Sequence, residues 1–238
     1  MDFSYLFTDT HSIITVSVGV GMLIILYLFY GLIFFRFGIQ ARKAEKQADE
    51  HTTGTSPASV VMLTHNQADM LRLHLPFILE QVHPDYEIVV TDYQSHDDTQ
   101  FVLQLCSSYY NNLKNTSLQQ DVNFFQGIKY PLALGIQSAK KDNVIVLTEP
   151  DCEPAGGDWL STITTPFANP DTQIVLGYTC LRSKTNPLGI LQQYDNMVYN
   201  CRMLSSAALG HPYTGNGRNL AFRRSFFFDN GGFISHYN

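Results

Sequence analysis

The stretch VIVLTEPDCEP, Val144 to Pro154, is a run of β-branched and aliphatic residues that ends in an acidic turn. An uninterrupted apolar run of this length predicts a strand that is buried on both of its faces. Glu149 and Asp151 flank a proline at its end, and Glu153 follows. The acidic end is either a solvated turn, which is the expected role of Glu153, or a set of carboxylates that holds a metal ion against an anionic substrate.

Strand-like and helix-like segments alternate from residue 58 onward. Short apolar runs predict strands at residues 59–64, 87–91, 143–148 and 173–177, with residues 122–125 as a further candidate. Apolar residues at helical spacing predict helices at residues 69–81, 98–110 and 132–140. Alternation of this kind predicts right-handed βαβ units, and therefore an α/β fold with a mainly parallel sheet.

Polar residues follow three of the predicted strands directly, at residues 64–66, 92–95 and 149–151. Ligands of open parallel sheets bind beyond the carboxyl ends of the strands. The sequence therefore predicts that these three segments gather along one edge of the sheet. Asp97 and Asp98 come slightly later and are expected to cap the helix that starts near Thr99.

These segments together resemble glycosyltransferase family 2, whose members are inverting nucleotide-sugar transferases with the GT-A fold. The resemblance spans residues 58 to 233, in order and at similar spacing. It is carried by SVVMLTHN, EIVVTDYQSHDDT, KYPLALGIQSAKKDNVIVLTEPDCEP with its counterpart of the Asp-x-Asp motif, DWL, and TGNGRNLAFRRSFFFDNGGF. It implies that this part of the chain is a GT-A domain, which would follow the transmembrane helix that the first residues predict.

The resemblance also implies roles for residues that would bind the nucleotide. Thr64, His65 and Asn66 would line the base and ribose pocket. Asp92 would lie there too and would accept a hydrogen bond from a uracil-like ring. Lys129 would approach the nucleotide or its diphosphate, and the favoured donor is a UDP-sugar.

A second group of residues would bind the metal and the sugar. Glu149 and Asp151 occupy the Asp-x-Asp positions, with Asp151 as the expected direct ligand of Mg²⁺ or Mn²⁺. These cations prefer oxygen ligands and stabilise the charge of a departing diphosphate. Gly217, Arg218 and Asn219 would lie near the donor sugar or the acceptor.

Several positions depart from the family pattern. Glu149 stands where the first aspartate is usual, Tyr93 replaces the second acid of a common Asp-Asp pair, and His65 replaces a tyrosine. The family's general base is an aspartate after the Gly-Gly-Phe segment, so we expect this base beyond Asn238. The alternative is a membrane module that binds a nucleotide sugar without catalysis.

Residues 12 to 35 contain no charged side chain. As a helix this segment would reach roughly 36 Å, which is enough to cross a hydrocarbon core of about 30 Å. A buried core helix is the alternative. Arg36, Arg42, Lys43 and Lys46 follow the segment and no lysine or arginine precedes it, so the positive-inside rule predicts a cytoplasmic soluble part.

The expected organisation is a tail at residues 1–11, a transmembrane helix at 12–35, a juxtamembrane helix and linker at 36–57, and the GT-A domain at 58–238. The net charge of −6 argues against a nucleic-acid partner. We therefore expect a single-pass enzyme of a bacterial-type inner (plasma) membrane. It would transfer a sugar to a glycan or a lipid-linked acceptor, as in the synthesis of cell-envelope polysaccharide.

Overall fold

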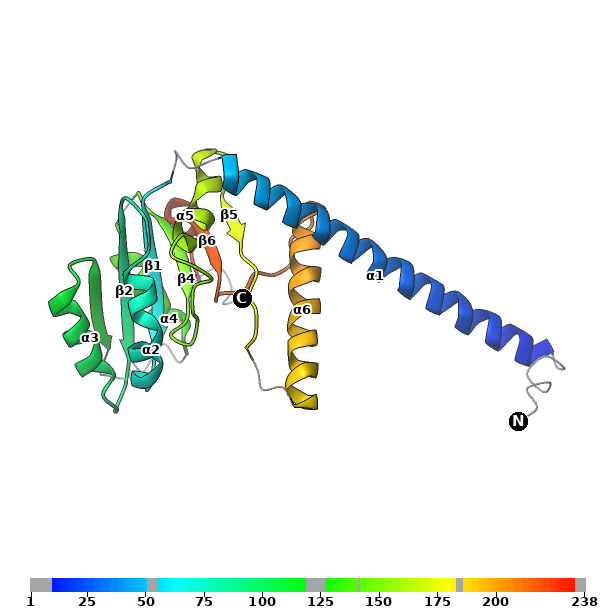
Figure 1. Cartoon of the computed structure of the whole chain (residues 1–238), viewed down its shortest axis with the longest axis horizontal. Helices are drawn as coiled ribbons and strands as arrows, with labels where there is room; N and C mark the ends of the chain where they lie inside the picture. Colours follow the sequence, from blue (N-terminus) through cyan, green and yellow to red (C-terminus); the bar gives the residue numbers. More distant parts are fainter. Residues whose placement is uncertain (1–9, 51–54, 119–126, 141, 183–185, 234–238) are drawn as a thin grey trace. The chain divides into compact units, whose positions relative to one another are not determined.

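The computed structural model describes residues 10–50, 55–118, 127–140, 142–182 and 186–233. The chain divides into two compact units. One unit comprises Met1–Lys46 and Cys180–Thr214, and the other comprises Gln47–Thr179 and Gly215–Asn238. The second unit contains the sheet, whose strands run from cyan through green to yellow in Figure 1, with the last strand, β6, in orange-red.

The sheet has six strands in the order β3-β2-β1-β4-β6-β5. The strands are β1 (Ala58–Thr64), β2 (Tyr86–Tyr93), β3 (Leu113–Leu118), β4 (Val144–Thr148), β5 (Ile174–Leu176) and β6 (Leu220–Arg223). β1 pairs in parallel with β2 and β4, and β2 pairs in parallel with β3. β6 runs antiparallel to both β4 and β5. The predicted α/β class with a mainly parallel sheet is confirmed.

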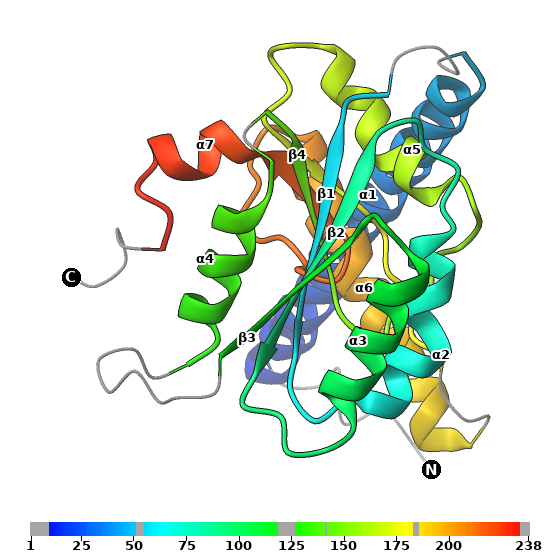
Figure 2. The ribbon, with the colours of Figure 1, turned by 90° about the vertical axis from the view of Figure 1, so that its left-hand side faces the viewer.

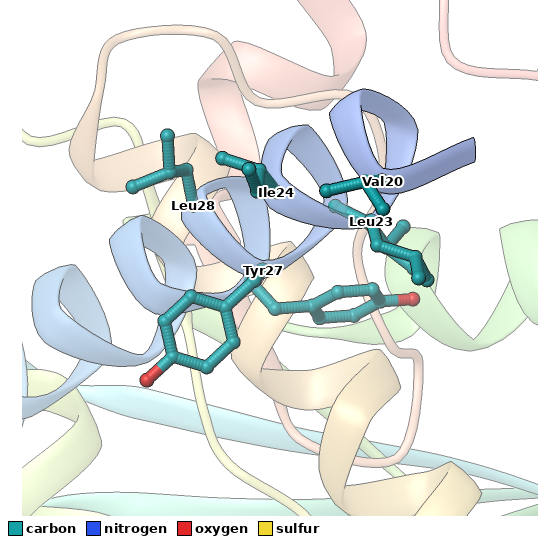
Figure 3. Close-up of a pocket in the computed structure, with 7 residues that line it drawn as sticks. Val20, Leu23, Ile24, Tyr27 and Leu28 are labelled. Carbon is teal, nitrogen blue, oxygen red and sulfur yellow. The ribbon is translucent and has the colours of Figure 1, made fainter. Parts of the chain in front are cut away.

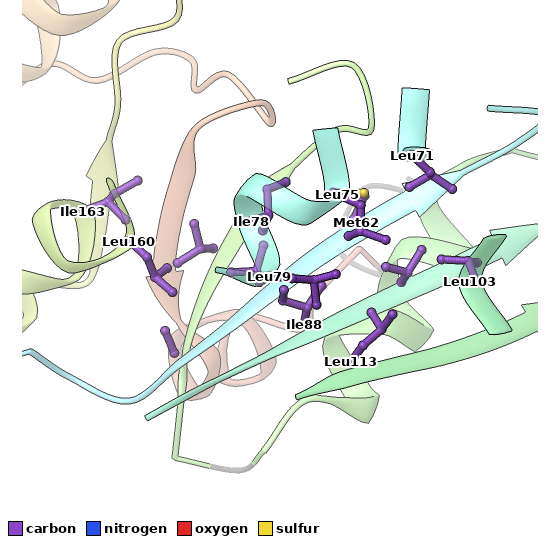
Figure 4. Close-up of a cluster of buried hydrophobic side chains, with 14 of the residues drawn as sticks. Met62, Leu71, Leu75, Ile78, Leu79, Ile88, Leu103, Leu113, Leu160 and Ile163 are labelled. Carbon is purple, nitrogen blue, oxygen red and sulfur yellow. The ribbon is translucent and has the colours of Figure 1, made fainter. Parts of the chain in front are cut away.

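Helices cover both faces of this sheet (Figure 2). One face carries α2 (Ala68–Leu79), α3 (Thr99–Tyr109), α5 (Trp159–Thr164) and the 3₁₀ turn η2 (Thr165–Ala168), and the other carries α4 (Lys129–Ser138) and α7 (Arg224–Asp229). Because successive side chains of a strand point to opposite faces, Met62 packs in the α2–α3 layer (Figure 4) while Val61 packs under α4.

Most predicted elements are present, with ends that differ by a few residues. α4 begins at Lys129 rather than Leu132, because Pro131 is tolerated in the first turn of a helix. The candidate strand at residues 122–125 lies outside the described residues. β3 was not predicted, because four consecutive residues, Lys114 to Ser117, are polar and three of them are exposed, as on an edge strand. The helix α6 (Pro187–Ala208) and β6 were also not predicted.

The other unit is built on two long helices, α1 (Thr10–Glu50) and α6. The hydroxyl of Ser205 in α6 donates a hydrogen bond of 2.8 Å to the carbonyl oxygen of Ile33 in α1. Within α1, the segment Thr10–Ile39 contains an 18-residue window with a mean hydropathy of 2.4, and no residue of this window is buried. Its length and composition are sufficient for a membrane crossing, and it contains the predicted span at residues 12–35.

Gly135 brings α4 close to the sheet, and this contact gives a first testable prediction. A Cβ atom at this position would lie 2.8 Å from Cγ1 of Val61 and 2.9 Å from Oγ1 of Thr91. We expect Gly135→Ala to destabilise the sheet unit by about 1–3 kcal/mol, because overpacking outweighs the gain in helix propensity. Thermal unfolding followed by Trp159 fluorescence measures this, with the exposed Gln137→Ala as a control. A Gly135→Ala protein as stable as the parent would contradict the close contact.

Candidate functional site

The carboxyl ends of β1, β2 and β4 form one edge of the sheet, as predicted. Thr64 at the end of β1 pairs with Asp92 of β2. β6 runs antiparallel to β4, with Leu220 opposite Leu147. The segment that precedes β6 therefore lies at the same edge as the acidic turn that follows β4, which brings Arg218 to Glu149.

The acidic turn is closed by the backbone and paired with an arginine. The amide of Cys152 donates a hydrogen bond of 3.0 Å to the carbonyl oxygen of Glu149. Nη2 of Arg218 lies 2.8 Å from Oε2 of Glu149 and 3.2 Å from Oδ2 of Asp151. Burial alone lowers the pKa of Arg218, but the two carboxylates outweigh it and raise this pKa above its ordinary value. One cationic nitrogen thus marks the point on which both carboxylates converge.

The chemistry of this pair fits a hard divalent cation. Among the described residues no group of three or more histidine, cysteine or acidic side chains could enclose a metal ion. Glu149 and Asp151 supply two converging carboxylates, and Mg²⁺ or Mn²⁺ sites of one or two carboxylates are completed by water and substrate phosphates. The residues present therefore fit a metal ion that is shared with a diphosphate and exposed on one side.

Asp92 is the buried polar residue of this edge, with only 1% of its surface exposed. Its Oδ1 atom accepts a hydrogen bond from the hydroxyl of Ser95. Its Oδ2 atom is buried without a hydrogen-bond partner among the described residues, as is Oγ1 of Thr64. An unpaired buried carboxylate oxygen is costly, so these atoms indicate a site that a ligand's donor completes.

The loops after β1 and β2 hold each other in place. Asn66 and Gln94 both adopt left-handed backbone conformations, with φ of 50° and 52°. The amide of Asn66 donates to Oγ of Ser95 at 2.9 Å, and Oδ1 of Asn66 accepts from the amide of His96 at 2.7 Å. Asparagine tolerates this backbone region better than most residues. The side chains at this edge are therefore set by a crosslinked pair of loops.

The predicted helix caps are confirmed in part. Oδ1 of Asp97 accepts from the amide of Thr99 at 3.0 Å and its Oδ2 accepts from the amide of Ala68 at 3.1 Å. Burial raises the pKa of Asp97, but these hydrogen bonds outweigh burial and lower it. Asp98 instead forms an ion pair with Arg72. Asp97 thus ties the start of α2 to the start of α3.

The remaining predicted residues divide into structural and exposed positions. Nδ2 of Asn219 donates to the carbonyl oxygen of Tyr178 at 2.9 Å, and its Oδ1 accepts from Nε1 of Trp159 at 3.1 Å. Asn219 therefore fastens the end of β5 and the start of α5 to the start of β6. Lys129 is exposed in the first turn of α4.

His65 and Gly217 are exposed at the same edge, and Nδ1 of His65 lies 2.5 Å from the carbonyl oxygen of Tyr93. The sequence did not single out Ser95 as a partner of Asp92, nor Arg218 as a partner of the acids. A serine three residues after a strand-end aspartate was the available signal for the first of these contacts.

A shallow depression lies elsewhere, on the surface of α1 (Figure 3). Its lining comes from α1 alone and is almost wholly apolar: Val20, Leu23, Ile24, Leu26, Tyr27, Leu28 and Tyr30. This surface offers no charged group to a nucleotide or a phosphate. It suits contact with lipid chains, and the strand-end edge is the candidate substrate site.

A family model described as glycosyl transferase family 2 matches residues 59–228. The chain belongs to glycosyl transferase family 2. Among curated proteins no relative was found. The predicted GT-A fold is confirmed by this family match together with solved structures.

Three solved GT-A glycosyltransferase structures share the fold at low sequence identity. The mannosyltransferase PcManGT from Pyrobaculum calidifontis, in complex with GDP-Man and Mn²⁺, has a TM-score of 0.58 and 19% identity over 84% of this chain and 55% of that chain. S. aureus TarS 1-349 in complex with UDP-GlcNAc has a TM-score of 0.54 and 16% identity, covering 74% of this chain and 47% of that one. GalNAc-T7 with UDP, GalNAc and Mn²⁺ has a TM-score of 0.54 and 17% identity, with 76% and 38% covered. The chain therefore spans about half the length of the first two.

Proposed function

We propose that this protein is a membrane-anchored glycosyltransferase that transfers a sugar from a nucleotide-sugar donor to a glycan or lipid-linked acceptor. The observation that carries the proposal is the edge of the sheet. There a buried carboxylate, Asp92, lies at the end of β2, and two convergent carboxylates, Glu149 and Asp151, follow β4. The order of these groups along one edge, from β2 across β1 to β4, suits a ligand with a base at one end and a diphosphate at the other.

Each end of the donor has a chemical counterpart in the chain. The Oδ2 atom of Asp92, which has no hydrogen-bond partner in the described part of the chain, can accept a hydrogen bond from the ring N–H of a uracil, which favours a UDP-sugar. Glu149 and Asp151 would hold Mg²⁺ or Mn²⁺, which supplies positive charge for the leaving diphosphate. Lys129 in the first turn of α4 and Arg218 before β6 add the positive charge of the chain itself. The use of Mn²⁺ in two structural neighbours supports the metal assignment.

We further propose that α1 is a single-pass anchor in a bacterial-type inner membrane, with the sheet unit in the cytoplasm. The exposed apolar segment Thr10–Ile39 supports the anchor. Arg36 and Arg42 lie at its C-terminal end, and no basic residue precedes it, which supports the orientation. In spheroplasts the sheet unit should resist added protease until the membrane is disrupted, and cleavage in intact spheroplasts would reverse the orientation.

Calorimetric titration of the detergent-solubilised chain tests the donor assignment. UDP, UDP-sugars and GDP-mannose are each titrated into the protein, once in the presence of Mn²⁺ and once with a chelator in place of Mn²⁺. Absence of metal-dependent binding to every nucleotide sugar would refute the proposal. Donor hydrolysis or transfer by this chain, abolished by Asp151→Asn, would exclude the non-catalytic membrane module.

Replacement of Asp92 tests the base pocket. Asp92→Asn keeps the shape of the side chain and removes a buried charged acceptor. We expect UDP affinity to fall about 10- to 100-fold, since a hydrogen bond to a charged group contributes roughly 1.5–3 kcal/mol. The preference for UDP over GDP should shrink as well. Asp69→Asn, at a carboxylate with 89% of its side chain exposed, is the matched control, and unchanged UDP binding in Asp92→Asn would exclude this role.

A further inference from the structure

We propose that Arg218 competes with the divalent metal for Glu149 and Asp151, and that the donor diphosphate receives its guanidinium once the metal enters. The competition rests on the geometry of the acidic turn alone. The transfer of the guanidinium to the diphosphate rests also on the proposed function. It makes Arg218 a positioning residue that couples metal binding to donor binding.

The competition follows from where the guanidinium lies. A single nitrogen, Nη2, makes both contacts, at 2.8 Å to Glu149 and 3.2 Å to Asp151. A metal ion that both carboxylates ligate must approach this same point of convergence. The guanidinium and the metal therefore cannot both hold the pair, and one rotation of the Arg218 side chain releases both carboxylates.

The surroundings restrict that movement to the side chain. The amide of Arg218 donates to Oδ1 of Asn216 at 3.1 Å, and Nδ2 of Asn216 donates to Oγ1 of Thr179 at 2.8 Å. The next residue, Asn219, is held by Trp159 and Tyr178. Backbone and neighbours are thus fixed on both sides, and only the arginine side chain can swing away.

The strength of the ion pairs suits a reversible exchange. The side chains of Arg218, Glu149 and Asp151 are 41%, 47% and 37% exposed. Partly exposed ion pairs are weak compared with ligation of a divalent ion by two carboxylates. The metal can therefore displace the guanidinium, whereas without metal Arg218 keeps the acids from repelling each other.

Charge balance explains why the diphosphate would then take up Arg218. A diphosphate cannot approach two bare carboxylates without strong repulsion. When a divalent ion occupies Glu149 and Asp151, the displaced guanidinium can donate its N–H groups to the oxygens of the bound phosphates. Guanidinium groups recognise phosphate oxygens well. Metal and nucleotide binding are then positively coupled, and each raises the affinity for the other by the same factor.

Mn²⁺ titration monitored by electron paramagnetic resonance tests the competition in the full detergent-solubilised chain. Without nucleotide, we expect Arg218→Gln to bind Mn²⁺ about 3- to 10-fold more tightly than the parent, the range that loss of a partly exposed ion pair allows. Arg218→Lys should fall between the two. Arg72→Gln is the matched control, because Arg72 also bridges two carboxylates, Asp69 and Asp98. The Arg72→Gln protein should bind Mn²⁺ with the same affinity as the parent.

The same titration with UDP tests the transfer of the guanidinium. UDP should increase Mn²⁺ affinity more in the parent than in Arg218→Gln, because only the parent supplies the displaced cation to the diphosphate. Equal or weaker Mn²⁺ binding by Arg218→Gln without nucleotide would overturn the competition, provided that its Trp159 fluorescence unfolding matches the parent. An identical UDP effect in both proteins would overturn the transfer. Tighter Mn²⁺ binding by Arg218→Gln, with no UDP binding by any protein, would support the competition and refute the donor assignment.

Discussion

Asp151→Asn is expected to reduce Mn²⁺-dependent donor binding by at least about 100-fold. Even the loss of a residue that only hydrogen-bonds to a metal ligand lowers metal affinity about 10- to 100-fold, and Asp151 is expected to be a ligand itself. Asparagine keeps an oxygen at the same place but loses the negative charge that a hard divalent cation requires. The remaining acid, Glu149, would still pair with Arg218 at 2.8 Å. A metal ion would then face one carboxylate and an intact competing ion pair.

Two comparisons make this result specific to the metal. Glu153→Gln removes an exposed carboxylate of the same turn and should leave Mn²⁺-dependent binding within about twofold of the parent, since surface substitutions are usually nearly neutral. UDP binding in a chelator should be equal in Asp151→Asn and the parent, because the Asp92 pocket is unaltered. Calorimetry measures both quantities. Undiminished metal dependence in Asp151→Asn would remove this residue from the metal site.

The parallel part of the fold could be predicted from sequence because its strands are buried on both faces. β1 and β4 are continuous apolar runs with almost every residue buried, and such runs are readable without any partner. The polar residues just after these strands then follow from the geometry of parallel sheets. This reasoning predicts from the sequence alone that Thr64, Asp92, Glu149 and Asp151 share one edge of the sheet.

The contacts that give the site its electrostatics depend on pairings between distant residues. Arg218 meets the acids only because β6 returns antiparallel and sets Leu220 opposite Leu147. β6 is four residues long, so it lacks the length from which a periodic pattern could be read. The left-handed backbone at Gln94 is likewise set by the crosslinked loops, not by the residue's own preference.

The opposite edge of the sheet holds a buried carboxylate that we expect to support the fold. Glu87 lies near the start of β2 with only 4% of its side chain exposed. Its Oε1 atom accepts from Oγ of Ser59 at 2.6 Å and from the amide of Lys140 at 2.7 Å. Nζ of Lys114 lies 2.6 Å from Oε2. Glu87 thereby joins β1, β2, β3 and the segment before β4, at the edge away from the candidate site.

Glu87→Gln should destabilise the sheet unit by about 2–3 kcal/mol at neutral pH, the upper part of the range for hydrogen bonds to a charged group. Glutamine can still accept a hydrogen bond at its one side-chain oxygen. It presents an uncharged amide group to Lys114, so the ammonium group of Lys114 loses its ion pair. For a domain of this size the melting temperature should fall by roughly 4–12 °C. Trp159 fluorescence reports the transition. Asp85→Asn is the matched control, because the Asp85–Lys140 pair at the same edge is exposed on both sides and should matter little.

The pH dependence of stability separates the charge of Glu87 from its shape. Burial raises the pKa of Glu87, but the bonds from Lys114, Ser59 and the Lys140 amide outweigh burial, so its folded pKa lies below the value of 4.5 for a free glutamate. Its contribution is therefore complete above the unfolded pKa and is lost as pH falls through the folded pKa. The gap between the parent and Glu87→Gln should be widest near pH 7 and should shrink in the range below about pH 4.5. A gap that stays constant to pH 3 would mean that packing, and not the paired charge, is what Glu87 contributes.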